Sequence, residues 1–311
     1  GPTLLMAVIR FRPLAALFAA ASIALLPQAA RAESVLEQAA RTGQITMAGP
    51  VNVPPYAFLD SQKVLQGYSI DLAKLIAAEV SAYLGRSVQV QFQRQDDPIA
   101  LFQGVSQGGI DFTCGVAFTW QREMFVDYSL PIGLSGIRLL SAKGADGSPA
   151  SLAGSRIAVV KDSLGQTLLP QLNAKATPVV FPTLQAATDA FFAGKVKGVL
   201  GDSVLLANLV PPAKAASVAL VPNQGYVRYG VSCIVPENNS TFRNLVSLAI
   251  ARLQQGYLND DPQATAVVNR WFGPGSAMAL PPELIKAFFE SVLISHEQIE
   301  NPAPPTINSK P

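Results

Sequence analysis

The sequence predicts an α/β protein, in which strands and helices alternate along the chain and build mostly parallel sheets flanked by helices. Three observations predict this class. The chain has 311 residues, of which 49% are hydrophobic, and this suits one large or two medium domains with a substantial core. Apolar runs of strand length alternate with amphipathic runs of helical period. The same order of elements occurs twice, before and after Pro131.

The first series starts at a short apolar strand and contains two strand–helix steps. After its first strand comes a loop rich in glycine and proline at 49–55, and Gly85 ends its first helix. The expected elements are a strand at 45–48, a helix at 70–83, a strand at 88–92, a helix at 98–107 and a strand at 110–117. Such a βαβαβ unit builds a mostly parallel sheet.

The second series repeats this order and is followed by a late strand and helix. Its expected elements are strands at 137–141 and 156–160, a helix at 164–172, a strand at 179–181, a helix at 183–193 and a strand at 196–200. A strand at 229–235 and an amphipathic helix at 244–255 follow. This late return suggests two lobes that the chain joins by two crossings. Ligands usually bind between such lobes, at the carboxyl ends of the strands.

The composition excludes several classes of protein. Charged residues make up 14% of the chain, against roughly a quarter in an ordinary soluble domain, so neither a disordered protein nor a highly charged nucleic-acid binder is expected. A single histidine, His296, and two cysteines exclude a zinc site built on cysteine and histidine pairs. We therefore expect no metal site and no cofactor.

The N-terminal segment has the pattern of a secretory signal peptide. A basic stretch with Arg10 and Arg12 precedes an apolar run at 14–26, and the small-x-small sequence Ala30-Arg31-Ala32 follows. A membrane anchor is the alternative, but the run is short for a span. Cleavage after Ala32 would leave 20 basic and 21 acidic residues, a net charge of −1, so the basic balance belongs to the leader. A phosphate-backbone partner then has no compositional support.

A series of short motifs carries a family resemblance. These motifs are 67–73, 109–111, 119–122, 126–132, 152–159, 161–165, 194–199 with Asp202, 229–231 and 269–273. In this order they resemble the family-3 extracellular solute-binding proteins, the polar-amino-acid receptors of ABC importers. The resemblance covers about residues 42–273. It implies a two-lobed type II periplasmic-binding-protein fold with two hinge crossings, and a periplasmic location.

The resemblance also implies a division of the chain into five segments. Residues 1–32 would be the signal peptide, 33–131 the first part of lobe 1, 132–226 lobe 2, 227–275 the return segment of lobe 1, and 276–311 a C-terminal helix with a disordered tail. The helix is expected from an apolar stripe at Leu284, Ile285, Phe288, Phe289, Val292 and Leu293. It would pack on its own lobe or, alternatively, dock a partner.

Two opposite charges carry the ligand hypothesis. An amino acid presents a carboxylate and an ammonium on one carbon. Arg122 matches the family arginine that grips the carboxylate with a bidentate fork, and Asp202 matches the family acid that binds the ammonium from the other lobe. Only a closed protein would pair both charges. The alternatives are a solvated surface arginine and a helix N-cap.

Further positions match, replace or adjoin binding positions of the family. Ser163 matches a hydroxyl at a helix N-terminus, where plain capping is the alternative. Gly115 and Ala117 match positions that bind through the backbone. Three positions depart from the pattern of the family. Val53, with Asn52 beside it, stands where an aromatic residue is frequent. Ala117 and Leu164 stand where hydroxyl side chains are common. The pocket is thus less aromatic and less polar than usual. Further candidates for its lining are Tyr56, Asp97 or alternatively Pro98, Lys161 and Tyr226.

The two cysteines are expected to lie close together. Cys114 is in the strand at 110–117 and Cys233 in the strand at 229–235, and the resemblance implies that these strands are antiparallel neighbours. The export signal implies an oxidising compartment. A disulfide and two buried free thiols both remain open, because the geometry within a sheet is often poor for bridging.

The leading functional hypothesis is a monomeric periplasmic receptor that closes around a small zwitterion, an amino acid above all, and delivers it to an ABC permease. A second hypothesis is an orphan sensor without a permease, suggested by the added C-terminal helix. A third is an enzyme, since the fold also hosts a cyclohexadienyl dehydratase. That chemistry needs a positioned general acid, and no residue stands out as one. We therefore predict a protein that is not an enzyme.

Overall fold

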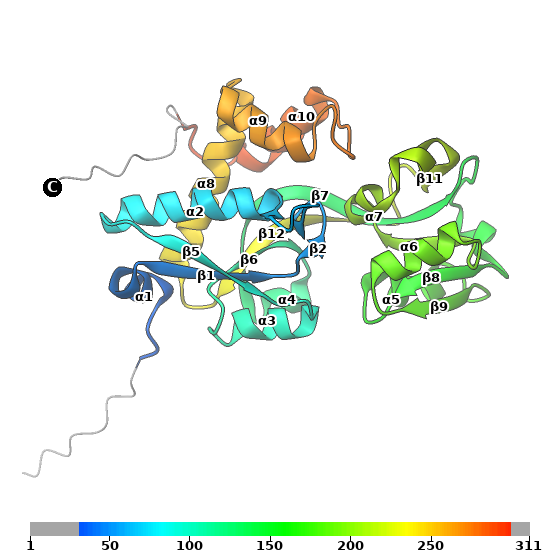
Figure 1. The fold of residues 1–311 in the computed structure, drawn as a ribbon, viewed down its shortest axis with the longest axis horizontal. Helices are drawn as coiled ribbons and strands as arrows, with labels where there is room; N and C mark the ends of the chain where they lie inside the picture. Colours follow the sequence, from blue (N-terminus) through cyan, green and yellow to red (C-terminus); the bar gives the residue numbers. More distant parts are fainter. Residues whose placement is uncertain (1–30, 300–311) are drawn as a thin grey trace, which may run out of the picture. The chain divides into compact units, whose positions relative to one another are not determined.

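The computed structural model describes residues 31–299 (Figure 1). The chain divides into two units, Gly1–Glu33 and Ser34–Pro311, and all elements below belong to the second unit. Most of the predicted signal peptide and the predicted disordered tail therefore lie outside the described residues. The α/β class is confirmed, with helices flanking the sheets.

The first predicted series forms as expected. It consists of β1 (Gln44–Gly49), α2 (Tyr68–Leu84), β5 (Gln89–Arg94), α3 (Pro98–Ser106) and β6 (Thr113–Ala117). β1 and β5 pair in parallel, and α2 ends at Gly85, as predicted. Asp97 caps α3 by accepting from the backbone N–H of Ile99 at 2.9 Å.

Two long antiparallel strands occupy the middle of a seven-stranded sheet. β7 (Val126–Ala142) and β12 (Val227–Pro236) run side by side (Figure 1), and the strand order is β6-β12-β7-β10-β8-β9, with β11 (Val218–Val221) also paired to β7. The prediction gave this strand only residues 137–141. The strand begins earlier and passes through Pro131, because the register shifts there and a bulge removes the need for a backbone N–H.

The second series is also formed. It consists of β8 (Arg156–Val160), α5 (Leu164–Leu172), β9 (Thr177–Phe181), α6 (Leu184–Phe192), β10 (Gly198–Asp202) and α7 (Ser203–Leu209). β8 pairs in parallel with both β9 and β10. The carboxyl ends of β8 and β10 therefore lie at one edge of the sheet, followed by Ser163 and by Asp202, respectively.

Several short elements were not predicted. The loop after β1 and the segment that follows it contain a small sheet of β2 (Asn52–Val53), β3 (Ala57–Leu59) and β4 (Leu65–Gln66). 3₁₀ turns occur at Pro149–Leu152 and Pro212–Ser217. α1 (Val35–Thr42) precedes β1 and buries Val35 and Ala39 on one face. Strands of two or three residues carry no periodic signal, since tertiary pairing alone defines them.

Two larger hydrophobic cores hold the sheet and helices together. Core A takes its buried residues from 35–132 and 231–289 together with Val204, and core B takes its residues from 137–221. α8 (Ser240–Leu258) crosses core A, and α9 (Pro262–Trp271) packs beside it. Tyr229 on β12 packs against both cores.

The C-terminal helix α10 (Pro282–Leu293) packs on core A. Ile285 and Phe289 are buried there, and the Phe289 ring stands edge-on to Tyr257 of α8 at 5.5 Å. Leu284 lies on the other side of the helix and is 59% exposed. The expectation that this helix packs on its own part of the protein is confirmed. None of the helices between residues 31 and 299 combines the length and apolarity that a membrane span requires.

Candidate functional site

Asp202 ends β10 and caps the helix that follows. Its Oδ1 atom accepts from the backbone N–H groups of Val204 and Leu205, both at 3.0 Å. The capping alternative is therefore present, but it uses only one carboxylate oxygen. A carboxylate has about four acceptor positions, so Asp202 can cap α7 and still bind a ligand.

The second oxygen of Asp202 accepts from a tyrosine on the central strand pair. The hydroxyl of Tyr229 donates to Oδ2. Burial raises the pKa of Asp202, while the hydrogen bonds from Tyr229 and from the α7 backbone lower it. Burial and the neighbouring carboxylate both raise the pKa of Tyr229, so its hydroxyl keeps its proton and remains a donor.

Tyr56 connects Asp202 with β6. The Tyr56 side chain is buried in the loop before α2, and burial, together with the charge of Asp202, raises its pKa. Its ring lies against Gly115 of β6, where a Cβ atom would come within 3.0 Å of Tyr56 Cγ. Gly115 has φ +88°, a conformation that favours glycine. The close approach and the backbone conformation both explain why glycine stands here.

Arg122 lies near the end of the same strand. It is on the short helix α4 (Trp120–Glu123), and its Nη1 atom donates to the carbonyl of Ala117 at 3.0 Å. The hydroxyl of Tyr128 donates to the same carbonyl at 2.9 Å. Within residues 31–299 no acidic side chain forms a salt bridge with Arg122, so most of its guanidinium donors are available to a ligand.

Five predicted site residues are thus linked in one series. The charge of Asp202 acts on Tyr56, the Tyr56 ring lies against Gly115, and β6 continues from Gly115 to Ala117, whose carbonyl accepts from Arg122. A negative charge stands at one end and a positive charge at the other. No hydrogen bond or ion pair within the described range joins Arg122 directly to Asp202.

Ser163 and Leu164 lie at the sheet edge where β10 ends. The Ser163 hydroxyl donates to the carbonyl of Val160 at 2.6 Å and accepts from the N–H of Gln166 at 3.3 Å, so it caps α5. A Cβ atom on Gly165 would collide with the Leu200 carbonyl oxygen, which shows how closely α5 approaches β10. Leu164 is 39% exposed at this helix start.

The other three candidates lie on the first half of the chain. Val53 packs against core A, together with Tyr56. Asn52 is exposed beside it in β2, and Asp97 is exposed at the start of α3. No hydrogen bond or ion pair in the described part of the chain connects Asn52 or Asp97 with Arg122 or Asp202. The structure therefore joins Val53 to the group and leaves Asn52 and Asp97 outside it.

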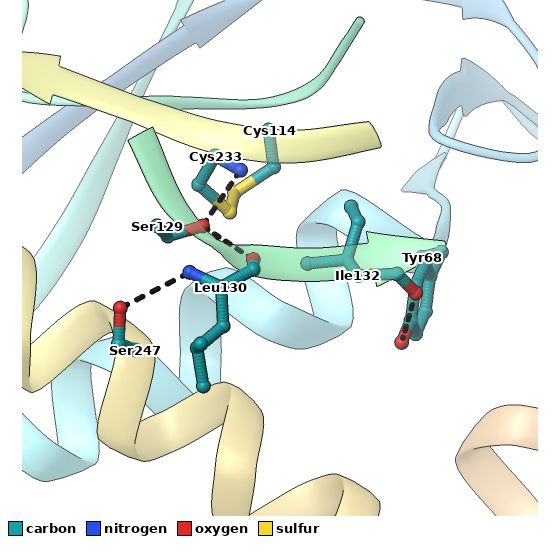
Figure 2. Close-up of a disulfide and its surroundings, with 7 residues drawn as sticks. All are labelled: Tyr68, Cys114, Ser129, Leu130, Ile132, Cys233 and Ser247. Atoms are coloured by element: carbon teal, nitrogen blue, oxygen red, sulfur yellow. Dashed lines mark hydrogen bonds between the residues drawn. A yellow bond between two sulfur atoms is a disulfide. The ribbon is translucent and has the colours of Figure 1, made fainter. Parts of the chain in front are cut away.

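A disulfide lies immediately before Gly115. Cys114 on β6 and Cys233 on β12 are direct antiparallel partners, and their sulfurs are bonded (Figure 2). The Ser129 hydroxyl accepts from the Cys233 N–H at 2.9 Å and donates to the Leu130 carbonyl at 2.8 Å, while the Leu130 N–H donates to the Ser247 hydroxyl at 3.1 Å. The disulfide and this network tie β6, β7, β12 and α8 together beside the candidate site.

Other sites are not indicated within the described part of the chain. No group of three or more histidine, cysteine, aspartate or glutamate side chains there could hold a metal ion. Two surface hollows occur elsewhere, one over Leu75, Glu79 and Arg252, the other over Asp146, Ser155 and Lys197. Neither contains Arg122 or Asp202. The electrostatic and contact pattern therefore locates the candidate site better than surface shape does.

Comparison with known families settles the class of protein. Residues 45–274 match the family model of the bacterial extracellular solute-binding proteins, family 3. The chain belongs to this family. The resemblance predicted from the motif order is confirmed, and so is the solute-binding function.

Family-3 relatives match most of this chain. It is 25% identical over 299 residues to the glutamate/aspartate import solute-binding protein of Escherichia coli K12, covering 90% of this chain and 93% of the relative. A solved ancestral arginine-binding protein bound to arginine has a TM-score of 0.61 at 24% identity, covering 74% and 99%. An ancestral amino acid-binding protein described as a precursor of cyclohexadienyl dehydratase has a TM-score of 0.62 at 20% identity, covering 77% and 100%. These structures support the type II fold.

Two residues of the candidate site were not identified from the sequence. Tyr229 was noted only as part of a strand motif, and Ser135 was not singled out at all. Ser135 Oγ lies 3.4 Å from Ser203 Oγ and 3.5 Å from the Val204 nitrogen, beside Asp202. The only sequence signal at Tyr229 was its hydroxyl group, and a hydroxyl group alone does not indicate which residue it contacts.

Proposed function

We propose that the protein is a monomeric periplasmic receptor that closes around an amino acid and delivers it to an ABC importer. The observation that carries this proposal is the linked series of residues with Asp202 at one end and Arg122 at the other. An amino acid carries the complementary pair of charges. Its carboxylate matches the free donors of Arg122, and its ammonium matches the partly occupied carboxylate of Asp202.

The two lobes of this receptor follow from the two cores. Residues 33–131 and 227–275 would form lobe 1 around core A, and residues 132–226 would form lobe 2 around core B, with 276–311 added to lobe 1. The chain passes between them in β7 and in β12, which pair with each other. A ligand that binds Arg122 and Asp202 together stabilises the closed state, because only there are both ligand charges paired.

The two charges indicate the class of ligand, and the relatives indicate which ligand side chains should be tested first. The proteins named above bind glutamate or aspartate in one case and arginine in another, so amino acids with charged side chains should be tested first. Val53, Ala117 and Leu164 make the pocket less aromatic and less polar than is common in the family. Export to the periplasm would follow cleavage after Ala32.

A thermal-shift screen of the twenty amino acids tests this function. A ligand that binds only the folded protein raises the melting temperature with its concentration. Arg122→Ala should abolish the shift, since loss of the partner for a buried carboxylate is of order 3–5 kcal/mol. Arg156→Ala is the matched control, because Arg156 is exposed at the amino end of β8, away from the edge with Asp202.

The outcomes separate the receptor from its alternatives. An unchanged affinity in Arg122→Ala would refute the carboxylate assignment, and the absence of any stabilising amino acid would refute the proposed ligand class. A dehydratase would convert its ligand to a product. A receptor only binds its ligand, and we therefore expect mass spectrometry to recover the bound amino acid unchanged. An orphan sensor would bind the amino acid equally well. Uptake of that amino acid by cells that express a permease encoded beside the protein would then not depend on the protein.

A further inference from the structure

A pair of facing residues on the two long strands holds the carboxylate of Asp202. Tyr229 of β12 and Ser135 of β7 are direct partners in the antiparallel register. The Tyr229 hydroxyl donates to Asp202 Oδ2, and the Ser135 hydroxyl lies within 3.4–3.5 Å of polar atoms at the start of α7. Both strands that connect the two cores therefore contact the segment that carries the acid.

Hydrogen bonds surround the carboxylate of Asp202. Each carboxylate oxygen has two lone pairs. Oδ1 accepts two backbone N–H groups at 3.0 Å, and Oδ2 accepts the Tyr229 hydroxyl. A side-chain hydrogen bond with Ser135 also lowers the pKa of Asp202. A ligand ammonium would have to share the carboxylate with these donors, so the position of Tyr229 bears on how an ammonium can approach.

Tyr229 is itself held by packing on two sides. Its side chain packs against core A and core B, so its position depends on how the two cores lie along β7 and β12. Tyr56 is the other titratable side chain that faces Asp202, and its pKa is raised, so it is a neutral group there. No cationic side chain between residues 31 and 299 forms an ion pair with Asp202.

We propose, on the basis of the proposed function, that Tyr229 is a positioning residue that orients the Asp202 carboxylate for the ligand ammonium and makes this orientation depend on the hinge strands. Tyr229 acts through Asp202 and does not touch the ligand. Without its hydroxyl, the carboxylate keeps its capping bonds to α7 but loses the bond that fixes Oδ2. Burial still raises the pKa of Asp202, while one of the hydrogen bonds that lower it is lost, so the pKa rises further.

The first test needs no ligand. Carbon-13 NMR of the Asp202 carboxyl carbon, assigned with Asp202→Asn, gives its titration midpoint. We expect the midpoint to move to higher pH in Tyr229→Phe, which keeps the ring and removes the hydroxyl. Tyr257→Phe is the matched control, because Tyr257 is also a buried tyrosine but packs on Phe289. An unchanged midpoint in Tyr229→Phe, or an equal shift in the control, overturns the proposal.

The second test measures binding of the twenty amino acids by calorimetry. For each amino acid that binds the wild type, the dissociation constant should rise about tenfold in Tyr229→Phe and stay unchanged in Tyr257→Phe. The affinity of Tyr229→Phe should also begin to fall at a higher pH as the solution is acidified, because protonated Asp202 cannot bind an ammonium.

The failures are distinguishable. If Arg122→Ala abolishes binding and Tyr229→Phe leaves every affinity unchanged, the positioning role is wrong and the proposed function stands. If no amino acid binds the wild type, the proposed function is wrong, and the ligand part of this proposal is refuted with it. The titration in the absence of ligand still decides whether Tyr229 holds Asp202.

Discussion

The disulfide between Cys114 and Cys233 should contribute strongly to stability. It joins residues that are 119 positions apart in the sequence. In the chain-entropy treatment, a loop of this length removes about 4.9 kcal/mol of freedom from the unfolded chain at 25 °C. Measured disulfides usually contribute about 2–4 kcal/mol, so the expected loss on reduction lies at about 2–5 kcal/mol. For a chain of this size, that corresponds to a melting temperature lower by about 4–10 °C.

Urea unfolding of the oxidised and the reduced protein measures this loss. The reduced chain should unfold at lower urea concentration, with a steeper dependence on urea, because its unfolded state exposes more surface. Cys114→Ala/Cys233→Ala is the control, since a reducing agent should leave its stability unchanged. Equal free energies of unfolding for the oxidised and reduced wild type would refute the reasoning. Peptide mapping without a reducing agent checks that the bond is present.

Two further predictions compare a buried contact with an exposed one. Glu79→Ala should cost about 1.5–3 kcal/mol of unfolding free energy, because it removes a carboxylate, only 5% exposed, that Arg252 contacts at 2.9 Å. Lys286→Ala, which breaks the exposed pair with Asp260, should change the unfolding free energy much less. Phe289→Ala should cost about 3–5 kcal/mol, and Leu284→Ala on the exposed side of α10 within about 0.5 kcal/mol. Urea unfolding measures all four, and equal costs within either pair would contradict the burial argument.

Local patterns predicted most elements of this fold. The bounds of β8 and α5 agree with the prediction, since an apolar run and a helical period are properties of neighbouring residues. β2, β3 and β4 were missed, because strands this short exist only through their partners. β7 was predicted only over 137–141, while the strand spans Val126–Ala142 and includes Pro131, where its pairing with β12 is irregular.

The sequence by itself determined the α/β class, the family and the two opposite charges, because each of these depends on residue types in a fixed order. Arg122 and Asp202 stand out as soon as the motifs are aligned along the chain. The tertiary structure decided which groups face them. The Tyr229 hydroxyl reaches Asp202 from 27 positions away, and Tyr56 meets Gly115 across 59 positions. Such contacts depend on strand register and on packing between cores, which no local pattern of residues encodes.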